Sequence, residues 1–403
     1  MARFWQHRLR LPFLVQSIPM SPPVSTDLAR PKSVLESVLV PLVILGLLYA
    51  FVCAINVMGA GLKILAQAPA TEATVQGLFA RAANPVAGLF VGILVTSFVQ
   101  SSSFTTSLTV GLVATGQISV VSAVPIVMGA NIGTSVTSIL VSLGHVSARL
   151  EFRRAFGAAI VHDIFNVLTV VLILPIELTT HALSRTATIL ASVFISPTET
   201  VPSNPLKAAT KPVVDGICVG LEHLLAAREE WIGAIMGLAG LLALLLSLVL
   251  LVRVLKRLIL TRLEAFFARY FFRNWALALT LGLCVTVMVQ SSSVTTSLVV
   301  PLAGAGVLRL QQVFPYTLGA NIGTTVTSLL AAAATGTPAG LAVAFAHLLF
   351  NTVGTAVFLP LRAIPIGLAH WYATLAATRR GLALLYLVVV FFVLPILCIM
   401  LTR

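Results

Sequence analysis

Two short polar clusters, set inside apolar sequence, are the residues of this chain best suited to chemistry. Both read Gln-Ser-Ser-Ser, the first at Gln100–Ser103 and the second at Gln290–Ser293. Serine hydroxyls and the amides freed at a helix start can hold an anion, whereas carbonyl, hydroxyl and amide oxygens suit a hard cation such as sodium. The clusters therefore predict a site for small ions.

A second motif, Gly-Ala-Asn-Ile-Gly-Thr, follows each cluster. It occupies Gly129–Thr134 and Gly319–Thr324, so that residues 100–138 and 290–328 align without a gap at a shift of 190 residues. Glycines allow turn geometry, and the asparagine supplies a neutral oxygen with two donors. We expect a backbone break at each motif, within an internal repeat.

Close helix packing is the competing explanation for these small residues. Small side chains let helices approach one another, and hydroxyls can bond to their own backbone. For one cluster alone, packing would be the better interpretation. The recurrence of the same cluster with the same glycine-flanked asparagine favours a ligand site.

Two histidines and one aspartate are further candidates. His162 with Asn166 and His347 with Asn351 repeat a spacing that lies on one helix face, and we favour packing and hydrogen bonding over direct ligation for both histidines. Asp163 lies within an otherwise apolar span, where it needs a cation, a proton or water. The alternative is a structural aspartate bonded to His162 or Asn166.

Composition indicates the elements that must position these residues. The chain has 403 residues, of which 58% are hydrophobic and 9% charged, and apolar runs long enough to span a bilayer recur. This pattern predicts a polytopic helical membrane protein rather than a soluble domain or a β-barrel. The formal charge of +13 is explained by basic loops on the cytoplasmic side and does not indicate nucleic acid.

Each half of the chain is predicted to hold three spans and one re-entrant hairpin with its QSSS turn at membrane depth. The predicted spans are 38–65, 125–143, 155–175, 231–254, 314–334 and 338–360, with hairpins at about 84–115 and 274–305 and a last apolar helix after Arg380. Three spans per half invert the second half relative to the first. Inverted repeats with broken helices are typical of secondary transporters.

The predicted fold is an all-α membrane protein with two inverted-topology repeats, each with a re-entrant hairpin and a broken helix. The predicted parts are a cytoplasmic or interfacial tail (1–33), the first repeat (34–177), an extracytoplasmic linker (178–228), the second repeat (229–362) and a C-terminal transmembrane helix (363–403). A segment between Glu72 and Arg81 is expected at the interface. The four cysteines show no disulfide or metal-ligand pattern.

At these motifs the chain resembles the type II sodium-dependent phosphate cotransporter family. The match covers roughly residues 45–175 and 240–360, and rests on the paired QSSS and GANIGT motifs and on RRAFGAAIVHDIFN before the linker. The resemblance implies that the two QSSS turns face each other and hold phosphate through hydroxyls and amides. It also implies that Asp163 matches an aspartate of charge-moving members, which recruits an additional sodium ion.

The motifs and the resemblance together give the candidate residues for phosphate and sodium. They are Gln100, Ser101, Ser102, Ser103, Thr105, Asn131, Thr134, Ser135, Gln290, Ser291, Ser292, Ser293, Thr295, Asn321, Thr324 and Thr325, with Asp163 for the additional sodium. Sodium is the only metal expected, as a coupling ion, and no cofactor is expected. The expected partners are phosphate, sodium and the lipid bilayer.

The predicted function is electrogenic, sodium-coupled transport of inorganic phosphate across a bacterial inner membrane, with the N-terminus in the cytoplasm. The short linker without a cysteine pair, and the lack of a PhoU-like domain, indicate a minimal bacterial form. A carrier of another oxyanion or a phosphate exporter remains possible on these residues. An anion channel is disfavoured because intramembrane Lys and Arg are nearly absent from the repeats. An enzyme is disfavoured because no nucleophile–base pair is visible beyond His162 and Asp163.

Overall fold

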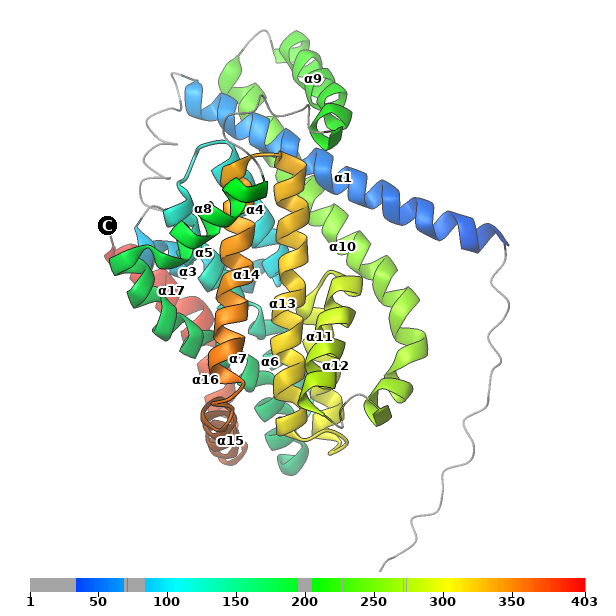
Figure 1. The fold of residues 1–403 in the computed structure, drawn as a ribbon, viewed down its shortest axis with the longest axis vertical. Helices are drawn as coiled ribbons and strands as arrows, with labels where there is room; N and C mark the ends of the chain where they lie inside the picture. The colour runs from blue at the N-terminus through cyan, green and yellow to red at the C-terminus, as the bar shows by residue number, and fades with distance from the viewer. Residues whose placement is uncertain are drawn as a thin grey trace, which may run out of the picture. The chain divides into compact units, whose positions relative to one another are not determined.

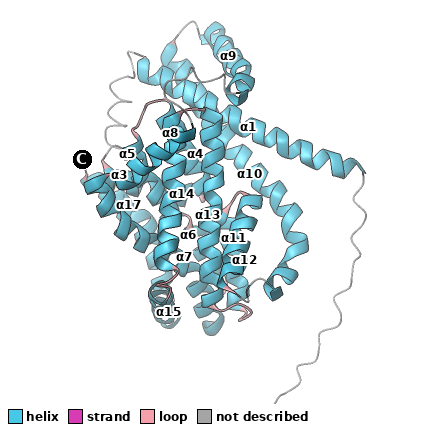
Figure 2. Ribbon diagram, in the orientation of Figure 1, coloured by secondary structure: helices cyan, strands magenta, loops and turns pink. Residues whose placement is uncertain are grey.

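A computed structural model describes residues 34–68, 71, 84–194, 205–225, 228–270, 272 and 274–402 of the chain. The regular structure in these ranges is helical, without a strand, as Figure 2 shows. The predicted all-helical fold is thereby confirmed. The predicted tail at 1–33 and the interfacial segment at 72–81 lie outside the described residues. Residues 1–43 and 44–403 form separate units, and the contacts given below belong to the second.

The helices of the described residues follow one another in the order labelled in Figure 1. They are α1 (Val34–Gln67), α3 (Pro85–Val99), α4 (Ser102–Ala114), α5 (Val120–Gly133), α6 (Ser135–Leu143), α7 (Arg149–Thr180), α8 (Ala182–Phe194), α9 (Pro205–Leu225), α10 (Glu229–Tyr270), α11 (Trp275–Val289), α12 (Ser292–Gly304), α13 (Leu310–Thr335), α14 (Pro338–Phe358), α15 (Ala363–Thr378), α16 (Gly381–Val388), the π-helix η2 (Val389–Val393) and α17 (Leu394–Leu401).

Two helical hairpins occupy the predicted positions, α3–α4 and α11–α12. Asn84 caps α3 by accepting from the amides of Val86 and Ala87, and Pro85 follows at a position where a missing N–H costs nothing. Asn274 caps α11 in the same way through the amide of Ala276. Each hairpin therefore starts at an asparagine cap and turns at its QSSS cluster.

The predicted backbone break at Gly319–Thr324 is wrong, because α13 is continuous from Leu310 to Thr335. In the first repeat the interruption is confined to Thr134, whose φ of −59° and ψ of −30° remain helical. The glycines serve close packing instead. A methyl group on Gly129 would overlap the carbonyl oxygen of Leu89 in α3, and one on Gly319 would overlap that of Leu279 in α11.

Two cavities indicate which helix ends lie near the two ends of α13. Thr115, just before α5, lines one cavity together with Thr335 at the end of α13. Arg153, near the start of α7, lines another cavity together with Leu310 at the start of α13. The start of α5 therefore lies toward the end of α13, and the start of α7 lies toward the start of α13. The inversion of the second repeat stays a prediction.

Two parts of the chain hold more helices than predicted. The linker contains α8 and α9, and α8 packs along α14. The buried carboxylate of Glu177 accepts from the amide of Leu183 at 2.7 Å and so caps the start of α8. After residue 362, α15 precedes the predicted apolar helix, and Pro395 explains the π-helix η2 in that helix because proline lacks an N–H.

Six described helices are long and apolar enough to cross a membrane. They cover Leu39–Leu65, Val120–Leu143, Arg149–Thr180, Glu229–Leu251, Pro338–Phe358 and Gly381–Leu401. The predicted span 314–334 lies in α13 and is not among them, because α13 carries polar residues such as Asn321 and Thr327 that are buried inside the protein. The helices are those of a multi-pass membrane protein, while the repeat and linker boundaries stay predictions.

Candidate functional site

Both QSSS turns begin with a glutamine in the left-handed backbone conformation. Gln100 has φ 55° and ψ 32°, and Gln290 has φ 58° and ψ 26°. His181 is the one other non-glycine residue with positive φ in the described ranges. Glycine adopts this conformation freely, whereas another residue is strained by about 1–3 kcal/mol. Strain kept at equivalent places in both repeats indicates that the amide side chain is needed there.

A helix starts immediately after each glutamine. Ser101 accepts from the amide of Phe104 and caps α4, and Ser291 accepts from the amide of Val294 and caps α12. The first amides of a helix have no acceptor within it, and the helix dipole is positive there. With the buried hydroxyls of the second and third serines, each turn offers the donors that an anion needs.

The two turns lie within hydrogen-bond distance of each other. The hydroxyl of Ser103 donates to the backbone oxygen of Gln290 at 3.3 Å. Thr327 of α13 donates to the Oε1 atom of Gln290 at 2.8 Å, and its repeat equivalent, Thr137, lies 3.5 Å from Oε1 of Gln100. The structure thus brings together two clusters that are far apart in the sequence.

Reciprocal contacts join the repeats beside the turns. The hydroxyls of Ser138 and Thr296 are 3.0 Å apart, and Ser328 donates to Thr106 at 3.0 Å. Both contacts join positions that the shift of 190 residues makes equivalent. The sequence reasoning missed these four residues, although the repeat alignment contains them.

The asparagine of each GANIGT motif lies within hydrogen-bond distance of a histidine from the other repeat. His162 Nε2 lies 2.6 Å from Oδ1 of Asn321, and His347 Nε2 lies 3.4 Å from Oδ1 of Asn131. Asn321 also donates to Oδ1 of Asn166 at 2.7 Å, and Asn166 donates to the backbone oxygen of Asn131 at 2.8 Å. These buried contacts agree with hydrogen bonding as the role of the histidines, and they tie the two motifs into one network.

Asp163 is fully buried and accepts two hydrogen bonds. Ser135 donates to its Oδ1 atom at 2.9 Å, and the hydroxyl of Tyr386 donates to Oδ2. The structural partners considered from the sequence, His162 and Asn166, do not bond it. Tyr386 belongs to the C-terminal helix outside both repeats, and no local pattern in the sequence signals this contact.

Five threonines among the candidates bond to their own helices. The hydroxyls of Thr105, Thr134, Thr295, Thr324 and Thr325 each donate to a backbone carbonyl three or four residues earlier. The acceptors of Thr105 and Thr295 are Ser101 and Ser291, which belong to the QSSS turns. The structure therefore joins Thr105 and Thr295 to the turns, and it joins Thr134, Thr324 and Thr325 to the GANIGT helices α5 and α13.

The ligands gathered at the turns are neutral oxygens. Among the described residues no group of three or more His, Cys, Asp or Glu side chains could hold a metal. Hydroxyl, amide and carbonyl oxygens are ligands for hard cations such as sodium, and they bind weakly enough to release them. The arrangement thus combines donors for an anion with oxygens for a cation.

Comparison with known proteins gives a consistent match. The model of the family described as Na+/Pi-cotransporter matches residues 50–196 and 243–397. The chain is 36% identical to sodium-dependent phosphate transport protein 2A of Rattus norvegicus, over 88% of this chain and 66% of the relative. It is 30% identical to protein 2B of Homo sapiens, over 88% and 64%. The chain thus spans slightly less than two thirds of these relatives. No solved structure matches it.

Proposed function

Because the chain belongs to the Na+/Pi-cotransporter family, we propose that it is a secondary transporter that carries inorganic phosphate across a membrane with sodium as the coupling ion. The observation that carries this proposal is the meeting of the two QSSS turns, through Ser103 and Gln290. Its relatives in rat and human are named as sodium-dependent phosphate transport proteins, which supports the same pair of ions.

Phosphate binds between the starts of α4 and α12, where amides and hydroxyls from both repeats donate to its oxygens. Sodium binds next to it, on the neutral oxygens of the turns and of Asn131 and Asn321, and offsets the charge of the anion. Either ion alone would meet a poorer site than both together, because each supplies the opposite charge that the other needs. Mutual dependence of this kind is what couples the two ions.

The predicted inversion of the second repeat supports alternating access around this site. The reciprocal contacts Ser138–Thr296 and Thr106–Ser328 cross the boundary between the repeats. When one repeat moves against the other, weak hydroxyl contacts of this kind can break and reform at little cost. The membrane is the inner membrane of a bacterium, with the linker outside and the N-terminus in the cytoplasm.

Uptake of labelled phosphate into proteoliposomes tests this function. An inward sodium gradient is expected to drive accumulation above the equilibrium level, and an equal potassium gradient is not. Excess sulfate and arsenate in parallel samples measure selectivity among oxyanions. Equal uptake with both gradients would overturn the proposal, and stronger inhibition by sulfate than by unlabelled phosphate would assign the site to another anion.

Asp163→Gly is expected to leave phosphate uptake in place but to remove its dependence on membrane potential. A buried carboxylate recruits one more sodium ion, and a charge that crosses the membrane couples about 2.3 kcal/mol per 100 mV to accumulation. Without the carboxylate, divalent phosphate crosses with two sodium ions and no net charge. Uptake into vesicles clamped with potassium and valinomycin measures the difference. Tyr386→Phe is the control, since it keeps the carboxylate, and unaltered voltage dependence in Asp163→Gly would assign Asp163 a structural role.

Single cysteines at Leu224 and Arg379 are expected to report opposite sides of the membrane. The two residues are exposed and lie in α9 and just after α15, which Figure 1 shows at opposite ends of the bundle. After the four native cysteines are replaced by serine, an impermeant maleimide added to intact cells should label Leu224→Cys only. Permeabilised cells provide the control for reactivity. Equal labelling of both variants in intact cells would contradict the predicted topology.

A further inference from the structure

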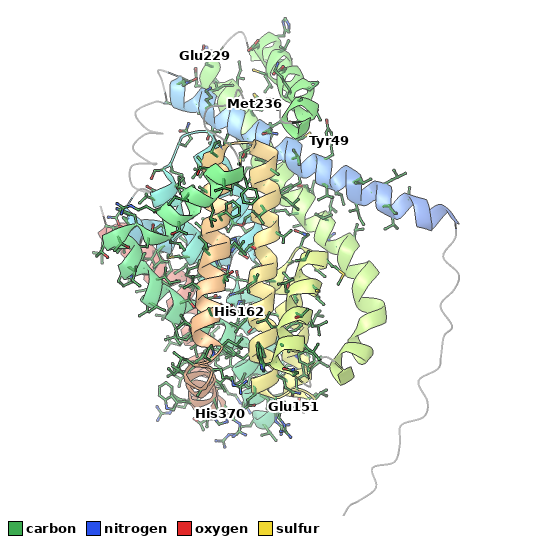
Figure 3. All side chains as sticks on the ribbon, viewed as in Figure 1. Tyr49, Glu151, His162, Glu229, Met236 and His370 are labelled. Carbon is green, nitrogen blue, oxygen red and sulfur yellow. The ribbon has the colours of Figure 1, made fainter. Side chains whose placement is uncertain are left out.

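A cavity of about 590 Å³ lies at the outer end of α12, against α7, α15 and the start of α13. Its walls carry the side chains of Arg153, Arg154, Arg309 and His370. Figure 3 shows His370 at the end of the bundle opposite to Glu229. The predicted topology assigns this end to the cytoplasm. We refer to this space as the arginine cavity.

The arginines of this cavity have no carboxylate partner in the part of the chain that the structure describes. The ion pairs found there are His145–Glu151 at 3.6 Å and Lys211–Asp215 at 2.7 Å. Glu151, the acid nearest in sequence to the arginines of α7, is therefore paired with a histidine instead. Without a carboxylate partner among the described residues, three positive charges around one space favour an anion inside it.

Arg154 is packed over the turn between α12 and α13. Gly306 in that turn has a φ of +81°, and a Cβ atom built on it would lie 2.6 Å from Nη1 of Arg154. The absence of a side chain at this position lets the guanidinium lie against the backbone, in the wall of the cavity that Arg309 also lines. A guanidinium held in this way can donate two parallel hydrogen bonds to a phosphate group.

A second cavity occupies the equivalent place in the first repeat. It has about 380 Å³, lies at the outer end of α4, and is lined by Lys63, Lys211, Asp215 and Thr335 among others. The hydrogen bond from Lys211 to Asp215, and then their opposite charges, raise the pKa of Lys211, so that this pair is neutral as a whole. Lys63 leaves a net charge of +1, against +3 from the three arginines of the other cavity.

The two cavities flank the QSSS turns from opposite ends. α4 and α12 have 13 residues each, so each cavity is separated from its turn by a helix of about 20 Å. Because the repeats are equivalent, the two cavities would be expected to resemble each other as entrances to the QSSS turns. Their charges differ, however. The approach at the end predicted to be cytoplasmic is the one that attracts an anion more strongly.

We propose that the arginine cavity is a second phosphate site, which binds inorganic phosphate without sodium at the end of the transporter predicted to face the cytoplasm. Any ligand of this cavity is expected to carry a phosphate group, since the arginine guanidinium groups bind phosphate oxygens and not the rest of the ligand. The cavity holds phosphate that has left the QSSS turns. Only this place in the transport path rests on the proposed function; the binding of phosphate in the cavity does not.

Equilibrium dialysis of the purified full chain with labelled phosphate in a sodium-free choline buffer isolates this site. The wild type is expected to bind phosphate under these conditions. The double variant Arg154→Gln with Arg309→Gln is expected to bind phosphate at least about tenfold more weakly than the wild type, because two charge-assisted hydrogen bonds are removed. Arg185→Gln with Arg379→Gln is the matched control, since it removes the same two charges at exposed residues outside the cavity and should bind like the wild type.

Sodium-dependent binding by the same double variant serves as the folding control and is expected to be retained. Absence of sodium-free binding in the wild type, or equal binding by wild type and double variant, would overturn the proposal. If sodium-free binding behaves as expected while the wild type shows no sodium-driven uptake, the arginine cavity stands and the proposed transport function fails.

Nanodiscs of two compositions distinguish free phosphate from a lipid headgroup. Phosphate binding that is the same in phosphatidylcholine and in phosphatidylcholine mixed with phosphatidylglycerol supports inorganic phosphate as the occupant. Binding that disappears when the anionic lipid is present would assign the cavity to the lipid and overturn the proposal.

Discussion

Ser102→Ala and Ser292→Ala are each expected to weaken sodium-dependent phosphate binding by about 1–3 kcal/mol, the cost of leaving a desolvated partner without its hydrogen bond. Both serines are buried, at 4% and 3% exposure, and both stand at the first position of a helix, α4 or α12. Because the turns meet, a phosphate ion that contacts one hydroxyl is within reach of the other.

Binding isotherms of the two single variants and the double variant measure this effect as a double-mutant cycle. Two groups on one ligand should show a coupling energy of about 0.5 kcal/mol or more. Ser247→Ala is the control, since Ser247 is buried in α10 and donates to the carbonyl of Leu244 within its own helix. A large loss in one variant with normal binding in its counterpart would rule out a shared site.

Gly319→Ala is expected to lower the stability of the protein by roughly 1–3 kcal/mol or more, as overpacking does. The added methyl group would overlap the carbonyl oxygen of Leu279, and backbone atoms cannot rotate out of its way. Gly129→Ala should behave alike, because its methyl group would overlap the carbonyl oxygen of Leu89 in the first repeat.

Thermal unfolding in detergent, followed by size-exclusion chromatography, measures the loss. Gly237→Ala in α10 is the control, since nothing lies within 4 Å of a Cβ atom there, and alanine in a helix is expected to stabilise by about 0.5–1 kcal/mol relative to glycine. Equal melting temperatures for Gly319→Ala and Gly237→Ala would show that α11 and α13 do not pack as closely as described.

The hairpins could be predicted from the sequence because their signals are local. An asparagine cap, a QSSS turn and a serine cap lie within one short stretch, and the stretch occurs twice. The course of α13 could not be predicted in this way. Glycine permits both a broken helix and a close helix crossing, and only the neighbour at Gly319, the backbone of α11, decides between the two.

The candidate site was predictable in its repeated part only. Ser103 and Gln290 belong to motifs that the repeat singles out, so their proximity follows from a common site. Tyr386 and Asp163 are 223 residues apart, and one of them lies in a helix that has no counterpart in either repeat. A contact of this kind depends on how α16 packs against the repeats, which no pattern along the chain encodes.

The number of phosphate ions bound per chain in a sodium-dependent manner tests the central claim most directly. Dialysis of the purified protein with labelled phosphate, in sodium and in choline, gives this number by difference. One shared site between the two QSSS turns predicts a single sodium-dependent phosphate per chain, weakened in both Ser102→Ala and Ser292→Ala. Two sodium-dependent phosphates per chain, or the same binding in both buffers, would contradict it.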